Sequence, residues 1–353
     1  MASVHIDLYS DTATKPTKEM REFMCAAEVG DEQRGEDPTV NKLQEMVAEL
    51  LGKEAALFLP SGTMCNQIAL AVHCRPGNFI ILDRSAHPLI SEAGGSAVLA
   101  GAVLYPIDGK NGQFTADQID EAIAPTSRYQ SPVQVVSIEQ TTNRPGGRIW
   151  PLEQMKSVCA KVREHNAYCH MDGARLLNAT VATGISAAEY ADPFDSAWID
   201  FSKGLGAPVG GALAGSKTFI HEAWQWKQRI GGAMRQAGII AAAGIYALEH
   251  HVERLAEDHR NAKLLAERIA TAPGIFIDPE VVETNMCRFD VKGTGLSSKA
   301  FAERLLVEHG VRVSSPERTI IRAIPYLGIT EADVESAADS ICALANKIAE
   351  SNS

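Results

Sequence analysis

A lysine stands where an apolar run gives way to a glycine-rich turn. Residues 198–208 read WIDFSKGLGAP, with Lys203 between the run and the turn. A lysine at the carboxyl end of a core strand lies in the crevice where ligands bind, and partial burial lowers the pKa of its amine. Gly204 and Gly206 leave room for a planar cofactor. The segment is typical of a lysine that forms a Schiff base, although a lysine without a covalent role would fit the same pattern.

An aspartate follows a second apolar run. Residues 170–175 read HMDGAR, and Asp172 comes directly after an expected strand over 167–170. A buried carboxylate stays charged only beside a partner. A pyridinium nitrogen is such a partner, because the carboxylate keeps it protonated and the ring then accepts electrons. A structural pair between Asp172 and Arg175 is the alternative interpretation.

Small residues separate a third apolar run from a helical pattern. Residues 60–63 read PSGT, between the run 56–59 and the helical segment 66–73. The free N–H groups at the start of a helix, with the positive end of its dipole, bind anions. The hydroxyls of Ser61 and Thr63 would complete a phosphate site. An ordinary turn with a capped helix is the alternative.

These segments belong to a chain in which short apolar runs alternate with helical patterns. Alternation of this kind predicts an α/β fold with a mostly parallel sheet, in which ligands bind at the carboxyl ends of the strands. Residues 249–271 are predicted to form one long helix, and a small α/β domain follows it. We therefore expect a large domain over residues 1–248, including the N-terminal segment, and a small domain over 249–353. Strands are expected at 56–59, 79–82, 103–105, 133–138, 167–170, 197–201 and 211–214.

Composition excludes several classes of protein. The formal net charge is -11 without a long basic run, which argues against nucleic-acid binding. No segment approaches the roughly 18 consecutive apolar residues of a membrane span, and the first ten residues do not form a signal peptide. The seven cysteines form no C-x-x-C pair and no H-E-x-x-H is present, so neither a disulfide framework nor a metal site is expected. An acidic cytoplasmic enzyme fits these features.

The motifs taken together resemble the low-specificity threonine aldolase family, within the β-eliminating-lyase branch of fold-type-I enzymes that use pyridoxal 5′-phosphate (PLP). The likeness covers about residues 5–347. It implies a large PLP-binding domain like that of aspartate aminotransferase, a small C-terminal domain, and a homotetramer or homodimer. The segments that carry it are 7–12, 35–41, 60–64, 172–175, 202–210 and 234–238.

The resemblance also implies roles for single residues. Lys203 would form the Schiff base with PLP, Asp172 would pair with the pyridine nitrogen, and His87 would stack on the ring, unless it is an ordinary loop histidine. The resemblance further implies that Gly62, Thr63 and Arg235 hold the phosphate, with Arg235 acting within the subunit or across an interface. Ser10, Arg175 and Arg322 would bind the substrate α-carboxylate, since an arginine bonds both oxygens at once, and Arg175 would also border the cofactor.

Departures from the family pattern gather on the substrate side. Thr142 stands where the family has a histidine near the substrate hydroxyl, and Arg34 stands where it has a tyrosine. Tyr9, Ser91 and the pair Pro325-Tyr326 also differ. One hypothesis is that Arg34 binds a distal anionic or aromatic group of the substrate. The other is that Arg34 and Tyr9 have exchanged places within a shared region.

The favoured reaction is cleavage of a β-hydroxy-α-amino acid, threonine-like or with an aromatic or acidic side chain, to glycine and an aldehyde. A base must remove the hydroxyl proton, and His87 is a candidate, directly or through water. β-Elimination or side-chain exchange on an amino acid is the alternative in the same fold. A non-catalytic binding module would require loss of Lys203 or Asp172, and both are present.

Overall fold

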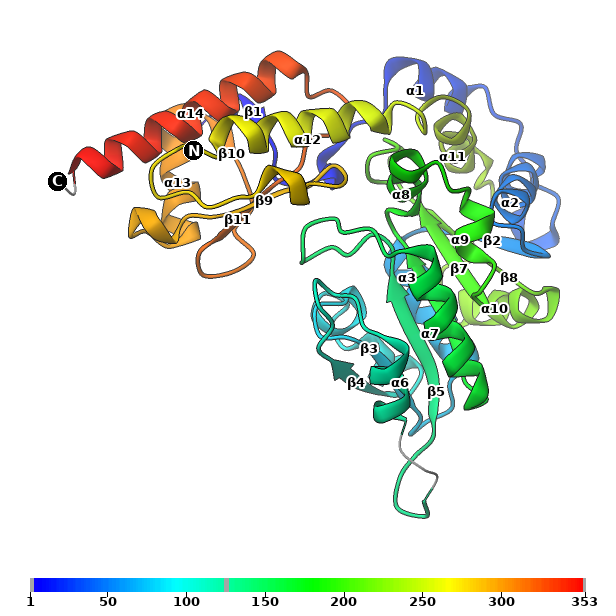
Figure 1. Ribbon diagram of the computed structural model, residues 1–353. Helices are drawn as coiled ribbons and strands as arrows, with labels where there is room; N and C mark the ends of the chain where they lie inside the picture. The colour runs from blue at the N-terminus through cyan, green and yellow to red at the C-terminus, as the bar shows by residue number, and fades with distance from the viewer. Residues whose placement is uncertain (1–2, 124–126, 352–353) are drawn as a thin grey trace. The chain divides into compact units, whose positions relative to one another are not determined.

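The structure is a computed structural model that describes residues 3–123 and 127–351. It divides into two compact units (Figure 1). The larger unit is the described part of Pro16–Asn143 and Ile149–Val252. The smaller unit is the described part of Met1–Lys15, Arg144–Arg148 and Glu253–Ser353.

The larger unit alternates strands and helices along the chain. Its strands are β2 (Ala55–Leu59), β3 (Phe79–Asp83), β4 (Val103–Ile107), β5 (Val133–Glu139), β6 (Tyr168–Gly173), β7 (Ser196–Asp200) and β8 (Gly211–Gly215). Its helices are α1 (Lys18–Cys25), α2 (Pro38–Leu50), α3 (Gly62–His73), α4 (His87–Ile90), α5 (Gly95–Leu99), α6 (Ala116–Ala122), α7 (Leu152–Glu164), α8 (Leu176–Thr183), α9 (Ala187–Ala191), α10 (Lys217–Arg229) and α11 (Gly238–His250).

These strands form one sheet in the order β2-β8-β7-β6-β5-β3-β4. Neighbours from β7 to β4 are parallel, whereas β8 is antiparallel to both β2 and β7. The inner strands β7 and β8 are buried along their whole length, as expected for a sheet covered on both faces. Helices α3 and α10 pack on the sheet through Ile68, Phe219 and Trp198. The predicted α/β fold with a mostly parallel sheet is confirmed.

Polar residues occur where the parallel strands end. Strand β5 ends at Glu139, β7 ends at Asp200, and β6 carries Asp172 one residue before its end. Glu139 lies opposite Asp172 in the register of the two strands. The apolar interiors of the strands fix this register, because slipping by one residue would turn every side chain to the other face. The sheet thus brings these carboxylates to a single edge.

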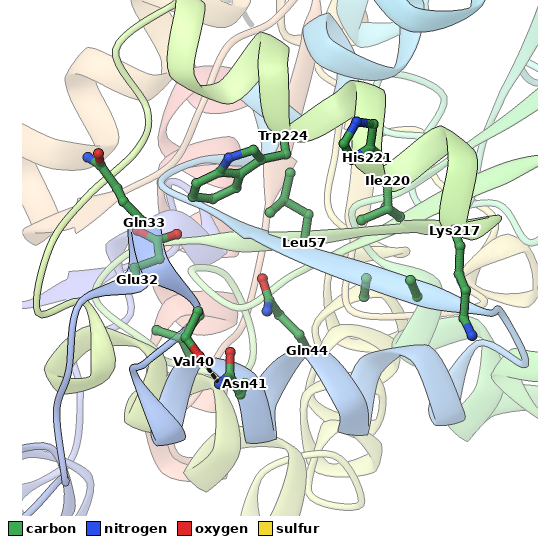
Figure 2. A pocket seen from close by; sticks show the side chains of 13 residues that line it. Glu32, Gln33, Val40, Asn41, Gln44, Leu57, Lys217, Ile220, His221 and Trp224 are labelled. Carbon is green, nitrogen blue, oxygen red and sulfur yellow. Dashed lines mark hydrogen bonds between the residues drawn. The ribbon is translucent and has the colours of Figure 1, made fainter.

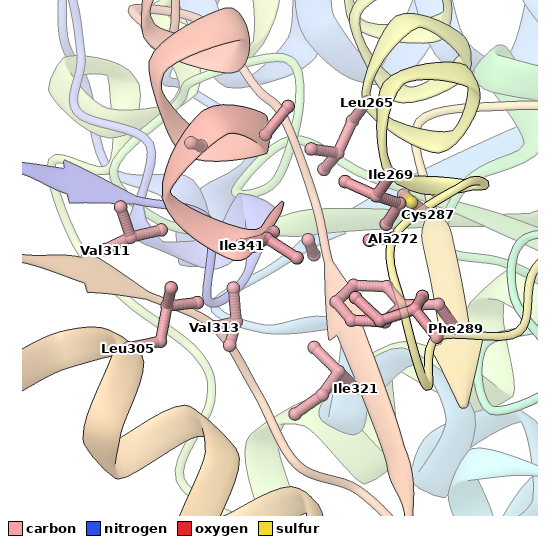
Figure 3. Close-up of a cluster of buried hydrophobic side chains, with 14 of the residues drawn as sticks. Leu265, Ile269, Ala272, Cys287, Phe289, Leu305, Val311, Val313, Ile321 and Ile341 are labelled. Atoms are coloured by element: carbon pink, nitrogen blue, oxygen red, sulfur yellow. The ribbon is translucent and has the colours of Figure 1, made fainter. Parts of the chain in front are cut away.

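The smaller unit has its own apolar core. Its strands are β1 (Ile6–Asp7), β9 (Cys287–Asp290), β10 (Val311–Arg312) and β11 (Ile320–Ala323), and its helices are α12 (Leu255–Ile269), α13 (Ser298–His309) and α14 (Glu331–Ser351). Strands β1 and β10 pair in parallel, and β9 and β11 pair antiparallel. Helices α12 and α14 lie side by side (Figure 1) and contribute Leu265, Ile269 and Ile341 to a core with Phe289 and Leu305 (Figure 3).

Two predictions about organisation differ from the structure. The N-terminal segment groups with the smaller unit, because β1 pairs with β10 and Ile324 N donates to Leu8 O at 2.9 Å. The single helix predicted over 249–271 is wrong: α11 ends at His250 and α12 begins at Leu255. The residues between the two helices include no glycine or proline, and the helical spacing of apolar residues continues across them, so the sequence pattern did not signal the break. The domain boundary at residues 248–249 stays a prediction.

Three further findings concern the described residues. None of their helices is long and apolar enough to cross a membrane. No group of three or more histidine, cysteine or acidic side chains among them is arranged to hold a metal ion. The seven cysteines are free thiols.

Candidate active site

Asn66 is fully buried and lies between two buried carboxylates. Its Nδ2 donates to Asp172 Oδ2 at 2.7 Å and to Glu92 Oε1 at 2.8 Å. Glu92 Oε1 also accepts a hydrogen bond from His87 Nδ1 at 2.7 Å. The structure therefore joins two predicted site residues, Asp172 and His87, through two residues that the sequence did not single out. We call these four residues the Asn66 cluster.

Local turns explain the positions of the predicted residues. Strand β3 ends at Asp83, whose carboxylate accepts the N–H groups of Ser85 at 2.8 Å and Gly109 at 2.9 Å. This turn starts α4 at His87. Asp172 Oδ1 accepts the N–H of Ala174 at 3.1 Å, which fixes the carboxylate at the end of β6.

Lys203 follows β7 and keeps little exposure. Its side chain is 18% exposed, and Nζ donates to Asp200 Oδ2 at 2.6 Å. The same carboxylate accepts the N–H and the hydroxyl of Ser202, each at 2.8 Å, on its other oxygen. The amine also lies 5.7 Å from the centre of the Trp198 ring. Asp200 thus anchors the turn and orients the amine.

The start of α3 belongs to the same edge of the sheet. Leu59 at the end of β2 and Asp200 at the end of β7 both pair with Gly211. A Cβ on Gly62 would lie 2.3 Å from the Trp198 ring and 3.2 Å from Asp200 Oδ2, so only glycine lets the helix start come this close. Ser61 caps the helix by accepting the Met64 N–H at 3.2 Å, and Thr63 in the first turn is exposed.

Burial and neighbouring charges shift the pKa of three groups. Burial acts to lower the pKa of His87, but the hydrogen bond to Glu92 and the charges of Asp172, Glu92 and Glu139 outweigh it, so the pKa is raised. Burial, reinforced by the charge of Asp172, raises the pKa of Glu139 to about 7. Burial also raises the pKa of Asp172, although Asn66 and Lys203 oppose that rise.

These features fit PLP. Lys203 supplies an amine for covalent attachment, and the glycine-started helix α3 supplies N–H groups suited to a phosphate. Asp172 receives one amide N–H and one backbone N–H in a buried setting that raises its pKa. A protonated pyridine nitrogen would give this carboxylate the cationic partner that favours its ionised form.

Arg34 and Arg235 meet on one acidic residue. Arg235 Nη1 lies 2.9 Å and Arg34 Nε lies 3.8 Å from Asp31 Oδ2. Both guanidinium groups are more than half exposed. Among the contacts of the described residues, none joins either arginine to Lys203, Asp172 or the rest of the Asn66 cluster. We call Asp31, Arg34 and Arg235 the Asp31 cluster.

The three residues expected to bind a carboxylate fall in both units. Arg175 follows β6 in the larger unit, is buried, and acts electrostatically on Glu139. Ser10 and Arg322 belong to the smaller unit. Ser10 is buried and accepts the Thr12 N–H at 3.2 Å, and Arg322 Nε donates to Ser314 Oγ at 3.3 Å.

A cavity of about 370 Å³ lies beside the loop that carries Arg34 (Figure 2). Its walls include Gln44 from α2, Leu57 from β2, and His221 and Trp224 from α10. Within the described part of the chain, no predicted site residue lines it. The cavity is therefore separate from the group around Lys203.

Sequence reasoning missed Asn66, Glu92, Glu139 and Asp200. Asp200 stands three residues before Lys203, and Glu139 directly follows the strand expected at 133–138, so the rule that ligands bind at strand ends pointed to both. Asn66 and Glu92 carried no such signal. Asn66 lies inside the mostly apolar helix α3, where a buried amide indicates a hydrogen-bonded site.

Comparison with known proteins agrees with this arrangement. Residues 7–292 match the β-eliminating lyase family. The low-specificity L-threonine aldolase of Escherichia coli K12 is 42% identical over 326 residues, covering 92% of this chain and 95% of that protein. Low-specificity L-threonine aldolase 1 of Arabidopsis thaliana is 39% identical over 338 residues, covering 93% of each.

Solved structures show the same fold. A threonine aldolase from Leishmania major superposes with a TM-score of 0.81 at 19% identity, covering 96% of this chain and 99% of the other. An aspartate aminotransferase from Rhizobium meliloti superposes with a TM-score of 0.71 at 16% identity, covering 98% and 92%. Together with the family match, the fold and the polar edge of the sheet define a fold-type-I PLP enzyme. The chain belongs to the β-eliminating lyase family, in its threonine aldolase branch, and is a PLP-dependent lyase.

Proposed function

We propose that this enzyme cleaves a threonine-like β-hydroxy-α-amino acid to glycine and an aldehyde. The observation that carries the proposal is the 42% identity to the Escherichia coli low-specificity L-threonine aldolase over nearly the full length of both chains. The arrangement of Lys203, Asp172 and His87 at one edge of the sheet supports it.

Bound PLP would supply an electron sink for the carbon–carbon bond that breaks. Lys203 Nζ would hold the cofactor and give way to the substrate amine. Asp172 would accept a hydrogen bond from the protonated ring nitrogen. Gly62, Thr63 and Arg235 would bind the phosphate. His87 would stack on the ring.

His87 is our candidate for the base. Because Glu92 is a carboxylate, His87 donates to it from Nδ1, and a neutral ring then keeps its lone pair on Nε2. We propose that Nε2 takes the proton of the substrate hydroxyl, directly or through water. Thr142 stands where the resemblance places a second histidine, so His87 would act without that neighbour.

On the substrate side we propose that Ser10, Arg175 and Arg322 bind the α-carboxylate. We also propose that Arg34 binds a distal group, which would favour a substrate with an acidic or aromatic side chain. The exposed guanidinium of Arg34 supports this, because it can bind a further anion.

Glycine release from threonine, allo-threonine, phenylserine and 3-hydroxyaspartate tests the proposal. Glycine from at least one member is the expected result. Release from threonine would support the family's substrate class, and release from only an aromatic or acidic member would assign the altered pocket to that side chain. If PLP is bound and no member yields glycine, the proposed reaction is wrong.

β-Elimination or side-chain exchange is the second candidate, because the matching family is named for β-eliminating lyases. These reactions break the Cα–H bond first. Elimination releases ammonia and a keto acid, whereas aldol cleavage releases glycine and an aldehyde, so product analysis on the same panel separates them.

We further propose a homotetramer or homodimer in the cytoplasm, with a domain boundary near residues 248–249. The family resemblance supports the assembly, and the seven free cysteines support the location, because thiols stay reduced in the cytoplasm. Native mass spectrometry of the PLP-loaded protein would test the assembly, and a monomer would contradict it.

A further inference from the structure

The amide of Asn66 has all four of its hydrogen-bonding positions filled. Nδ2 donates to Asp172 and Glu92, as described above. Oδ1 accepts from Trp198 Nε1 at 2.7 Å and from His170 Nε2 at 3.1 Å. An indole nitrogen can only donate, and carboxylates can only accept while ionised. Only one orientation of this amide satisfies its partners. In the flipped orientation the NH2 group of Asn66 would face the indole N–H of Trp198, and two donors cannot form a hydrogen bond.

The orientation of the Asn66 amide fixes the direction of each hydrogen bond in the series from His170 through Ser196 to His73. Because Asn66 Oδ1 is an acceptor, His170 must carry its proton on Nε2. Burial lowers the pKa of His170 to about 3, so the ring is neutral and Nδ1 accepts. Ser196 Oγ lies 2.8 Å from His170 Nδ1 and donates to it. His73 Nε2 lies 2.8 Å from the same hydroxyl and donates in turn.

The chain of bonds runs along the sheet from one end of the strands to the other. His73, at the end of α3, stacks between Tyr168 and Phe219 at ring distances of 4.6 and 4.7 Å. These three residues line a cavity of about 380 Å³. His170 and Asp172 lie two residues apart on β6, on the same face of the strand. The bonds thus connect a solvent-facing cavity to the carboxylate edge.

We propose that Asn66 is a positioning residue that holds Asp172 and Glu92 in place for the cofactor, and that His170, Ser196 and His73 form a one-directional hydrogen-bond chain that fixes its amide. The inference rests on the proposed role of Asp172 as partner of the PLP nitrogen. It does not depend on which bond of the substrate the enzyme breaks.

Two substitutions at His170 separate the proposed role from simple packing. In His170→Gln the amide nitrogen can take the place of Nε2 and keep the donor to Asn66. In His170→Asn the shorter amide reaches only Ser196, and Asn66 Oδ1 loses a partner. Both variants remove ring volume. The matched control is His259→Asn, at a histidine of α12 in the smaller unit.

The primary measurement is the dissociation constant of PLP, with the absorption spectrum of bound PLP as a second readout. Losing a buried hydrogen bond to the Asn66 amide should weaken PLP binding about tenfold in His170→Asn. We expect a change of less than about threefold in His170→Gln and in the control. Equal weakening in both His170 variants, or none in either, overturns the proposal.

A measurement on the unaltered protein covers the case in which the variants do not fold. Histidine nitrogens labelled with 15N report by NMR which ring nitrogen carries the proton, and His170 is fully buried. The expected result in the apoenzyme is a neutral ring protonated on Nε2 for the most buried histidine. A proton on Nδ1, or an imidazolium at neutral pH, would contradict the chain. Failure of aldol cleavage would leave both measurements unaffected.

Discussion

Two groups of charged side chains in the larger unit are held in opposite ways. In the Asn66 cluster the two carboxylates are buried, and each is bonded to neighbours from several elements. In the Asp31 cluster two arginines share the carboxylate of Asp31, which caps the short 3-10 helix Glu32–Arg34, and both arginine side chains remain more than half exposed. The first cluster is fixed before any ligand arrives. The second can exchange its partner for another anion.

This difference matches two different tasks. A cofactor site gains from groups whose geometry and protonation are set in advance, because nothing then has to reorganise when charge develops. Recognition of a variable substrate group tolerates exposed side chains, and exposed ion pairs contribute about 0–1 kcal/mol. The departures from the family pattern include Arg34 of the Asp31 cluster and no member of the Asn66 cluster.

The largest expected effect comes from Lys203. Lys203→Ala removes the amine that would attach the cofactor, so we expect no measurable turnover and loss of the visible absorption of attached PLP. Lys156→Ala, at an exposed lysine paired with Glu153, is the matched control and should retain both. An active Lys203→Ala protein with the absorption band would refute the assignment.

Glu139 should make the stability of the apoenzyme depend on pH. Its pKa is about 7 in the folded protein against 4.5 ordinarily. The folded state therefore binds the proton more tightly than the unfolded state does. Protonated Glu139 stabilises the folded state fully below pH 4.5, and this stabilisation is lost as pH rises through 7. The loss is up to about 3 kcal/mol. Urea unfolding at pH 5 and pH 7.5 should show this fall, and Glu139→Gln should flatten it. An equal fall in that variant would exclude Glu139 as the source.

A smaller effect is expected from Glu92→Gln. The substituted amide still accepts from His87 Nδ1. The buried Oε1 of Gln67 has no hydrogen-bond partner among the described residues, so the Gln67 amide can rotate to accept from the new N–H group. Exchanging a charged for a neutral acceptor costs about 1–1.5 kcal/mol, or roughly tenfold in kcat/KM. His87 must be neutral to act as a base, and losing the carboxylate lowers its pKa.

The acidic limb of the pH–rate profile should therefore move to lower pH in Glu92→Gln. Glu153→Gln, at an exposed position of α7, serves as the control and should leave the limb in place. An unshifted limb in Glu92→Gln would mean that His87 does not set it.

The local patterns of the sequence predicted much of this site. Apolar runs with polar ends led to Lys203 and Asp172, because in a parallel sheet the chain itself delivers such residues to one edge. Asn66 was not predicted, since its partners come from β6, β7 and the segment after α4. Only the register of the strands and the packing of α3 bring those partners together.

The unpredicted parts of the fold have the same origin. Strand β1 pairs with β10 across about 300 residues of sequence, and no local period signals such a pairing. Strand β8 is antiparallel to both of its neighbours, although its apolar run resembles those of the parallel strands in the same sheet. Direction and partner of a strand depend on the connections around it, which periodicity does not describe.

The smallest expected effect on stability, and the sharpest test of the comparison, comes from Arg34. Arg34→Ala breaks a 3.8 Å contact of an exposed side chain, so the free energy of unfolding should change by less than about 1 kcal/mol.

If Arg34 binds the distal group of the substrate, kcat/KM for an acidic or aromatic member of the panel should fall at least about tenfold relative to threonine in the Arg34→Ala variant. Compared with Arg34→Ala, Arg34→Lys should recover part of the preference for an acidic member. A lysine keeps the positive charge but lacks the two parallel N–H donors of a guanidinium group. Arg21→Ala, at an exposed arginine of α1, is the control. An unchanged ranking of substrates in Arg34→Ala would leave Arg34 without a role in recognition, and its exposure would then mean only that this side chain is solvated.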